Sequence, residues 1–286
     1  MKGVPPQQPQ SPRPADPVAQ MQQWAQRFAT QVNANLQHLN RQGLDFRRRI
    51  YSLELRQRLA DEGRSLRMPL WFQGQFGEDL LLYDILGEKP DGLLIEVGAF
   101  DGKNLSVTYA MDAIGWNCLL IEAIPQRVEQ CKTNRPHARV VHAALAEPGS
   151  PAEVEFTVTD DHWGGMLSYL TTNEQHQQAV NSPNVKQTKI RVPCTTMDEL
   201  LKDHTGEIAA ASIDVEGGEV NLLKGFDLNK HRPRVLLIED QGQKDPSPVG
   251  EYMKTQNYEF MGWLPHSRIY VRKDLKELMS RVSQRG

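Results

Sequence analysis

The sequence of 286 residues has few cysteines, no long apolar run and no excess of charge of one sign. Its three cysteines, Cys118, Cys131 and Cys194, lie far apart and form no C-x-x-C pair, so we expect reduced thiols in a cytoplasmic protein. No stretch approaches the about 18 consecutive apolar residues of a membrane-spanning helix, so none is predicted. The N-terminal residues contain no apolar segment of the kind found in secretory signals, and no such signal is expected.

Charge and composition further restrict the class of protein and the kind of partner. The chain has 33 basic and 36 acidic residues, a net charge of −3, and 39% hydrophobic residues. This balance is typical of a globular protein with a polar extension, and it does not indicate a nucleic-acid partner. The length suffices for one domain of about 200 residues with additional segments.

The first part of the chain differs from the rest in composition. Residues 1–17 are rich in Pro, Gln and Ser, and we expect them to be disordered. Residues 18–64 contain no proline, and apolar residues recur there at helical intervals, at Met21, Trp24, Phe28, Val32, Leu36 and Leu39. A helical pattern of this length without caps predicts a coiled coil or a docking helix, and our hypothesis is that it makes the protein a homo-oligomer. The folded domain then comprises residues 65–286.

The folded domain is organised around Leu93–Gly102, with the sequence LLIEVGAFDG. A short apolar run bounded by glycine predicts a buried parallel strand that ends in a tight turn. Asn104 or Ser106 can cap the helix that is expected next. Strand, glycine turn and helix are the start of a doubly wound α/β domain. Ligands bind such domains at the carboxyl ends of the strands, and Gly98 would let the backbone approach a ligand closely.

The turn lacks the middle glycine of the dinucleotide fingerprint G-x-G-x-x-G and carries acids, Glu96 and Asp101, on both sides. Negative charge suits a cationic ligand better than a pyrophosphate. A second strand, Asn117–Ala123, brings Glu122 24 positions after Gly98, where an acid commonly holds a ribose diol. The ligand implied has a ribose and a positive centre and lacks a phosphate, and S-adenosylmethionine, whose sulfonium and ammonium are both cationic, fits that description. The alternative, that Glu96 and Glu122 simply end their strands in solvent, stays open.

Strands and helices alternate through the rest of the domain, which predicts a mostly parallel sheet covered on both faces. Further strands are expected at 138–145, 152–159, 208–214 and 233–240, a strand and then a helix capped by Thr195 or Thr196 at 189–201, and a final antiparallel pair at 257–261 and 268–271. The irregular, polar segment 160–183 is expected to form a lid or an acceptor pocket.

Several motifs recur together in this domain. They are QFGEDL (75–80), IEVGAFDG (95–102), the GW…LLIEAIP run (115–125), HAAL (142–145), IDVEGGE…LLKG (213–225), LLIE (236–239) and IYVRK (269–273). Together they resemble the FkbM family of S-adenosylmethionine-dependent methyltransferases, over residues 72–273. The resemblance implies a Rossmann-like class I methyltransferase fold, an α/β domain with a mostly parallel seven-stranded sheet, helices on both faces and an antiparallel strand at one edge. It also implies O-methylation of a small-molecule or glycan acceptor, commonly at sugar or polyketide hydroxyls.

The resemblance further implies a cofactor site. Glu96, Gly98 and Gly102 would form the turn under the methionine part, Glu122 would take the ribose hydroxyls, and Ala143 with Ala144 would lie near the adenine. The full set of expected cofactor-binding residues is Gln75, Asp79, Glu96, Gly98, Ala99, Asp101, Gly102, Ser106, Glu122, Ala143 and Ala144, with Glu78 approaching from the same helix as Asp79.

Methyl transfer to an alcohol also requires removal of a proton, by a general base or by a metal that lowers the pKa of the alcohol. The acids Asp214, Glu216 and Glu239 end adjacent strands, and the loops offer His162 and His266. In this fold, groups at the position of Asp214 usually face the transferred methyl. Carboxylates gathered there can bind Mg²⁺ or orient acceptor hydroxyls without a metal, and both alternatives stay open. Asp214 can also be a cap of the following helix.

Three other functions compete with this interpretation. An NAD(P)-linked enzyme is disfavoured by the missing middle glycine. A nucleic-acid methyltransferase is disfavoured by DVEG in place of an N-P-P-aromatic run and by the acidic charge balance. The third is a non-catalytic methyltransferase-fold scaffold that acts through its N-terminal helical arm, since fold alone does not establish activity.

Overall fold

The computed structural model describes residues 17–160, 167–170, 181, 185–240 and 246–284. The predicted disorder of residues 1–16 and the candidate base His162 therefore lie outside the described residues, as does most of the predicted lid. The chain divides into two compact units, Met1–Arg49 and Ile50–Gly286. The last turns of the N-terminal helix thus belong to the second unit, whereas the sequence pattern placed the boundary at residue 64.

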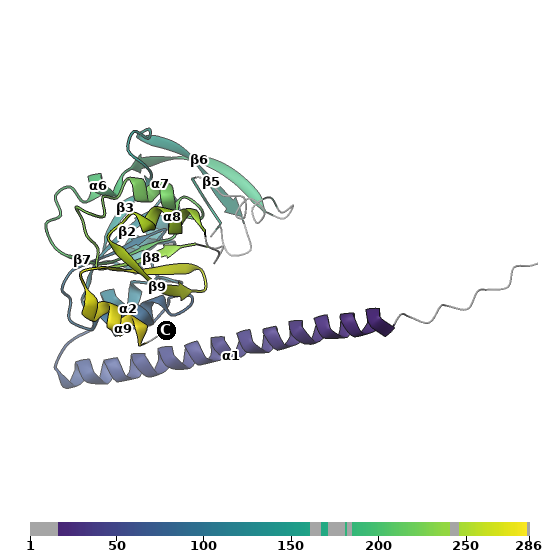
Figure 1. Ribbon diagram of the computed structural model, residues 1–286. Coiled ribbons are helices and arrows are strands. Elements are labelled where there is room, and N and C mark those ends of the chain that lie inside the picture. The colour runs from purple at the N-terminus through teal and green to yellow at the C-terminus, as the bar shows by residue number, and fades with distance from the viewer. Residues whose placement is uncertain (1–16, 161–166, 171–180, 182–184, 241–245, 285–286) are drawn as a thin grey trace, which may run out of the picture. The chain divides into compact units, whose positions relative to one another are not determined.

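The elements follow one another as strands and helices in alternation (Figure 1). In the first half of the chain they are α1 (Pro17–Asp61), α2 (Glu78–Leu86), β1 (Leu93–Val97), α3 (Tyr109–Ala113), β2 (Asn117–Glu122), α4 (Pro125–Asn134), β3 (Arg139–His142) and β4 (Ala144–Leu145). In the second half they are β5 (Glu153–Asp160), β6 (Lys186–Thr195), α6 (Met197–Leu200), β7 (Ile208–Ile213), α7 (Glu219–Lys224), β8 (Val235–Glu239), α8 (Pro248–Lys254), β9 (Tyr258–Leu264), β10 (Ser267–Arg272) and α9 (Lys276–Ser283).

A seven-stranded sheet forms the centre of the domain, in the order β3-β2-β1-β7-β8-β10-β9. The pairs from β3 to β8 are parallel, and β10 is antiparallel to both of its neighbours, β8 and β9. The helices α6, α7 and α8 lie on one side of this sheet and α2 and α9 on the other (Figure 1). The predicted fold, a mostly parallel sheet with an antiparallel strand near one edge, is confirmed.

Burial explains why these sequences form the centre of the sheet. Every residue of β7 and of β8 is buried, as are four of the five residues of β1. Strands covered on both faces are expected as nearly continuous apolar runs, and IAAASI and VLLIE have that pattern. The polar exceptions, Glu96 and Glu239, stand near or at the carboxyl ends of their strands, where a site can use them.

One predicted strand divides in two. The segment 138–145 was expected to be a single strand, but only β3 pairs with β2 in the large sheet. Ala144 and Leu145 pair with β6 instead and form a second sheet of order β4-β6-β5. The change follows a hydrogen bond from the Ala143 N–H to the Glu122 carbonyl, after which the Ala146 N–H bonds to Thr195.

Two predictions on helix caps have opposite outcomes. Thr196 caps α6, accepting a hydrogen bond from the Glu199 N–H at 3.1 Å, as predicted for Thr195 or Thr196. The prediction of a cap at Asn104 or Ser106 is wrong, because α3 begins only at Tyr109 and has no side-chain cap.

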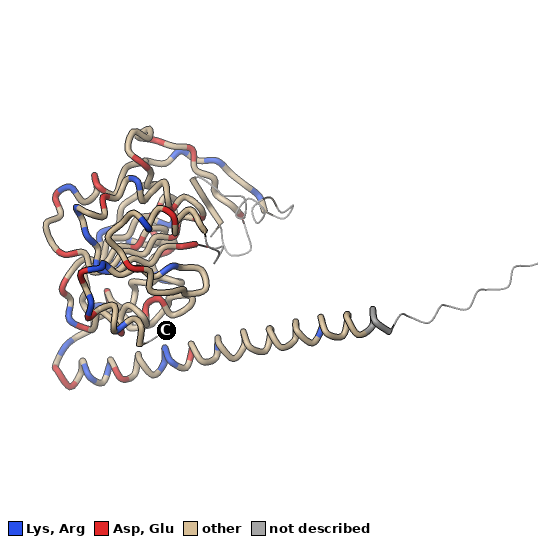
Figure 2. The backbone as a smooth tube through the Cα atoms, viewed as in Figure 1, with Lys and Arg blue, Asp and Glu red and all other residues tan. Residues whose placement is uncertain are grey.

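The N-terminal helix α1 is continuous from Pro17 to Asp61 and passes through Gly43 without a break. Among the residues that the structure describes, no helix combines the length and apolarity that crossing a bilayer requires. Lys, Arg, Asp and Glu are interspersed along the domain, whereas the N-terminal half of α1 carries few of them (Figure 2).

Candidate functional site

Two adjoining cavities open at the carboxyl ends of the central strands. The first, here the β2 cavity, is lined by Glu122, Ala143, Ala144, Phe156, Ser168 and Leu170 among others, and its empty volume with its mouth is about 770 Å³. The second, here the α2 cavity, is lined by Gln75, Glu78, Glu96, Ala99 and Ser106 among others, with about 620 Å³. Val97, Gly98, Phe100 and Asp214 line both, so the cavities meet where β1 and β7 end.

Gly98 lets these two strand ends come together. Its φ is 77°, a region that favours glycine, and a Cβ there would lie 1.9 Å from the carbonyl oxygen of Asp214. The sequence predicts that this glycine lets the backbone approach a ligand, and Gly98 does line both cavities; the structure adds its close approach to the backbone that follows β7. Any side chain at position 98 would displace Asp214 from the junction of the cavities.

Glu122 both shapes the β2 cavity and faces it. Its carboxylate accepts hydrogen bonds from the backbone N–H of Phe100 at 2.9 Å and of Ile124 at 2.8 Å. Burial raises the pKa of Glu122, while these two hydrogen bonds and the charge of Arg127 oppose the rise. Each oxygen accepts one of these bonds, which leaves acceptor capacity toward the cavity.

Glu96 is held by the loop that follows β1. It accepts hydrogen bonds from the Ser106 hydroxyl and the Val107 N–H, both at 2.8 Å, and from the Thr108 hydroxyl at 2.5 Å. Ser106, expected at a helix cap, is therefore a ligand of Glu96. Glu96 and Glu122 are each only 5% exposed, so the interpretation that they end their strands in solvent is wrong.

A buried arginine that sequence reasoning missed supports this loop. Arg135 has no exposed surface and pairs with the equally buried Asp112 at 2.7 Å. Its guanidinium also donates to the Gly102 carbonyl at 3.2 Å and to the Thr108 hydroxyl at 3.1 Å, and lies 3.9 Å from Glu96. Arg135 lies directly after helix α4 and belongs to none of the sequence motifs, so the sequence contained no signal for its role.

Three residues expected to bind the cofactor do not line either cavity. Asp79 is fully buried, and its carboxylate accepts backbone N–H bonds from Gln73 and from Gly74. Asp101 accepts backbone N–H bonds from the two positions after Gly102, at 2.9 and 2.8 Å. Gly102 packs on α4, where an added Cβ would lie 3.1 Å from the Cα of Cys131. These residues shape the loops around the site because local backbone donors engage the two carboxylates.

The other expected residues are brought together. Gln75, Ala99 and Ser106 line the α2 cavity, and Ala143 and Ala144 line the β2 cavity.

Glu78 completes the wall of the α2 cavity. It is 5% exposed and accepts the Phe76 N–H at 2.8 Å. Burial raises its pKa to about 7, against the opposing effect of its backbone hydrogen bonds. Glu78 is therefore neutral in slightly acidic solution and becomes an anion near neutral pH.

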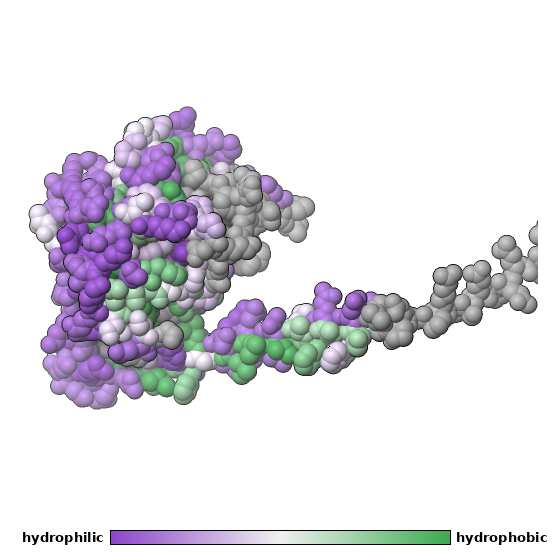
Figure 3. Space-filling view, in the orientation of Figure 1, coloured by the Kyte–Doolittle hydropathy of each residue, from purple (hydrophilic) through white to green (hydrophobic). Residues whose placement is uncertain are grey.

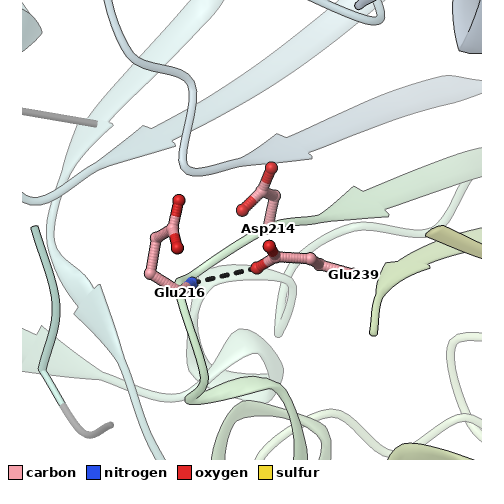
Figure 4. A group of neighbouring side chains, drawn as sticks. All are labelled: Asp214, Glu216 and Glu239. Carbon is pink, nitrogen blue, oxygen red and sulfur yellow. Dashed lines mark hydrogen bonds between the residues drawn. The ribbon is translucent and has the colours of Figure 1, made fainter. Parts of the chain in front are cut away.

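The acids Asp214, Glu216 and Glu239 gather at the ends of β7 and β8, with one oxygen of each within 4.8 Å of the others (Figure 4). The Glu216 N–H donates to the Glu239 carboxylate at 3.2 Å. Asp214 is exposed to both cavities, whereas Glu239 is buried behind it. Asp214 is not a helix cap: the N-cap of α7 is Gly218.

Desolvation by the surrounding protein raises the pKa of Asp214 and sets that of Glu239 well above its usual range, and the negative charges of Asp214 and Glu216 raise the pKa of Glu239 further. A hydrogen bond between the carboxyl groups of Asp214 and Glu239 lowers the pKa of the former and raises that of the latter. Both carboxyl groups cannot ionise this close together, so Asp214 and Glu239 share a proton. The electrostatic effect of His266 also lowers the pKa of Asp214.

These groups fit Mg²⁺ only in part. Carboxylate oxygens are the ligands that Mg²⁺ prefers, but it takes about six oxygens in near-octahedral geometry. A proton between Asp214 and Glu239 accounts for the approach of these two acids without a cation. The geometry gives the magnesium expectation no support.

Comparison with known proteins gives one family match. The model of the family described as "Methyltransferase FkbM domain" matches residues 96–261. No curated protein matches the chain.

Several solved structures resemble the chain at low identity. Human methyltransferase 10 domain containing protein is 14% identical over 68% of this chain and 79% of that chain, with a TM-score of 0.39. A SAM-dependent methyltransferase from Aquifex aeolicus is 12% identical over 68% of this chain and 88% of that chain, with a TM-score of 0.34. A TehB-like SAM-dependent methyltransferase from Corynebacterium glutamicum is 13% identical over 78% of this chain and 98% of that chain, with a TM-score of 0.35.

Proposed function

The chain belongs to the FkbM methyltransferase family, and on this premise we propose that it methylates a hydroxyl oxygen of a sugar, glycan or natural-product acceptor with S-adenosylmethionine. The observation that carries the proposal is the pair of neighbouring acids Asp214 and Glu239, of which Asp214 stands at the junction of two cavities of different chemistry.

The residues present fit the cofactor. The apolar walls of the β2 cavity, with Ala143, Ala144 and Phe156, suit a nucleobase, and the spare acceptor capacity of Glu122 suits ribose hydroxyls. In the α2 cavity the acids suit the cationic end of the cofactor. Glu96 already accepts several hydrogen bonds, so Glu78 is the carboxylate there with capacity for an ammonium group.

The bound cofactor supplies an electrophilic methyl group. The protein supplies position and a proton acceptor, because an in-line displacement gains much of its rate from alignment of the reacting atoms. Asp214 accepts the proton of the acceptor hydroxyl as the oxygen is methylated. Glu239 keeps its own proton and directs it to Asp214, which fixes the orientation of the base. His266 lies close enough to Asp214 to favour its anionic form.

We also propose a cytoplasmic location, which the three free cysteines support, and an acceptor other than nucleic acid, in keeping with the net charge of −3. Ser168, Leu170 and Glu216 at the β2 cavity supply polar and apolar surface for the acceptor.

Calorimetry with S-adenosylhomocysteine tests the first step. The protein should bind it, and Glu122→Ala should weaken binding at least about tenfold, by loss of hydrogen bonds to the ribose. Absence of binding to the unaltered protein would contradict the proposal and favour a non-catalytic scaffold.

Turnover with a panel of sugar and polyketide alcohols tests the second step. Asp214→Asn should bind S-adenosylhomocysteine normally and lose at least about tenfold in turnover, because the amide cannot accept the proton. Unchanged turnover would remove Asp214 from the mechanism.

A further inference from the structure

The helix α1 exposes large apolar side chains along residues 21–46, within the unit Met1–Arg49. Trp24 is 62% exposed, Phe28 57% and Phe46 65%, and the same stripe contains Met21, Val32, Leu36 and Leu39. Apolar and polar atoms form separate bands along the helix in Figure 3. Exposed apolar surface of this extent marks an interaction site rather than a solvated helix.

The polar positions of this segment argue against a lipid surface as the partner. Between Met21 and Phe46 they are mainly Gln and Asn, with Arg27 and Arg41 as the basic residues and no Lys. Helices that lie on membranes carry a polar face rich in Lys and Arg. A face of uncharged amides suits contact with another protein helix.

The apolar stripe matches a second copy of itself that runs in the opposite direction. Three pairs of positions have the same midpoint, between residues 33 and 34. They are Met21 with Phe46, Trp24 with Gly43, and Phe28 with Leu39. Val32 and Leu36 lie on either side of nearly the same point. A two-fold axis there would place the largest side chain of the stripe, Trp24, against Gly43, which has none. The space beside Gly43 is free, since no atom lies within 4 Å of a Cβ built on it.

We propose that residues 21–46 pair with the same segment of a second copy of this chain in an antiparallel arrangement, with Trp24 of each copy packed on Gly43 of the other. Gly43 destabilises the helix of the monomer, because glycine is the least favourable residue in a helix interior after proline. In the proposed dimer, the absence of a side chain at Gly43 leaves room for Trp24 of the other copy.

A parallel pair in register fits less well. It would set Trp24 against Trp24 and leave a void between the two copies of Gly43, although interiors are closely packed. It would also set the basic run Arg47–Arg49 beside its own copy, whereas the antiparallel pair separates the two runs to opposite ends.

The exposed apolar surface of residues 21–46 is large enough for a dimer interface. An aromatic side chain buries about 150–250 Å². The exposed parts of Trp24, Phe28 and Phe46, with the four aliphatic residues of the stripe, bring a pair of helices to the order of the 1,200 Å² at which standard interfaces begin.

Exchange of the two complementary residues tests the packing on the full chain. The chain should have the mass of a dimer by light scattering. Gly43→Trp should weaken dimerisation at least about tenfold, because it overpacks the site of Trp24. The double variant Trp24→Gly, Gly43→Trp should restore it, since it moves each contact to the other half without changing composition. A monomeric chain, or a dimer that Gly43→Trp leaves unchanged or tightens, would overturn the proposal.

Disulfide trapping tests the direction. The double variant Met21→Cys, Phe46→Cys should give covalent dimers, whereas either single variant should not. The two positions are 25 residues apart, about 38 Å along a helix, so they cannot bridge within one copy. Covalent dimers from Trp24→Cys alone would show a parallel pair and contradict the proposal. Binding of the chain to anionic vesicles without dimerisation would instead assign the stripe to a membrane surface.

Discussion

Glu96, near the end of β1, and Asp214, after β7, both line the α2 cavity but have opposite surroundings. Glu96 accepts hydrogen bonds from three consecutive residues and lies 3.9 Å from the buried guanidinium of Arg135. Asp214 and Glu239 instead lie within 4.8 Å of each other, and burial raises the pKa of both.

This difference separates an acid that holds structure from acids that hold a proton. A carboxylate beside a buried cation, with hydrogen bonds from three consecutive residues, fixes its donors in place. Neighbouring acids this close together cannot all ionise, so a proton stays among them and can move. The first arrangement builds the loop of the α2 cavity, and the second places a base where the two cavities meet.

The largest expected effect comes from removing the cation of the first arrangement. Arg135→Met should lower the free energy of unfolding by about 3–5 kcal/mol, because it leaves Glu96 and Asp112 buried without their partner. Urea unfolding measures the change.

Lys132→Met, in the last turn of the helix α4 that Arg135 follows, is the matched control, since its ion pair with Glu129 is exposed and should be worth less than about 1 kcal/mol. Similar losses in the two variants would refute the contrast between them.

The central strands were predictable because burial on both faces leaves a visible pattern. The runs in β1, β7 and β8 are nearly continuous in apolar residues, and each was found. The division of the third predicted strand was not predictable, because it depends on the pairing of Ala144 with Cys194, far along the chain.

The site residues that stand at strand ends were predictable, because the strand ends themselves can be recognised in the sequence. Glu122 and Asp214 end buried strands, so their place in the cavities follows from the parallel sheet. Asp79 and Asp101 have the same residue type, but nearby backbone N–H groups engage their carboxylates, and loop geometry of that kind has no signature in sequence. Arg135 was missed because its acid partners lie on other elements and no spacing connects them.

A smaller effect is expected in the pH dependence of cofactor binding, through Glu78. The pKa of Glu78 is raised by burial to about 7, so an ammonium group bound beside it favours the ionised form. Affinity for S-adenosylhomocysteine should therefore fall about tenfold between pH 8 and pH 6, as Glu78 takes up a proton. Titration calorimetry at several pH values measures the change.

Glu78→Gln should bind more weakly at pH 8 and lose most of this dependence. Asp84→Asn, on the same helix but away from both cavities, is the control and should retain it. An identical pH dependence in Glu78→Gln would assign the titration to another group, such as Glu122.

The smallest expected effect distinguishes a shared proton from a bound cation at Asp214 and Glu239. If Glu239 is protonated, Glu239→Gln keeps a donor toward Asp214, and turnover with a responsive acceptor should stay within about threefold of the original. Glu239→Ala removes the donor and should lower turnover at least about tenfold, since Asp214 then loses its orientation. If the cluster instead held Mg²⁺, the amide would replace an anionic ligand and turnover would fall as steeply in Glu239→Gln as in Glu239→Ala. Equal losses in these two variants would therefore remove the shared proton from the mechanism, whereas a clear difference would establish that Glu239 acts as a neutral donor.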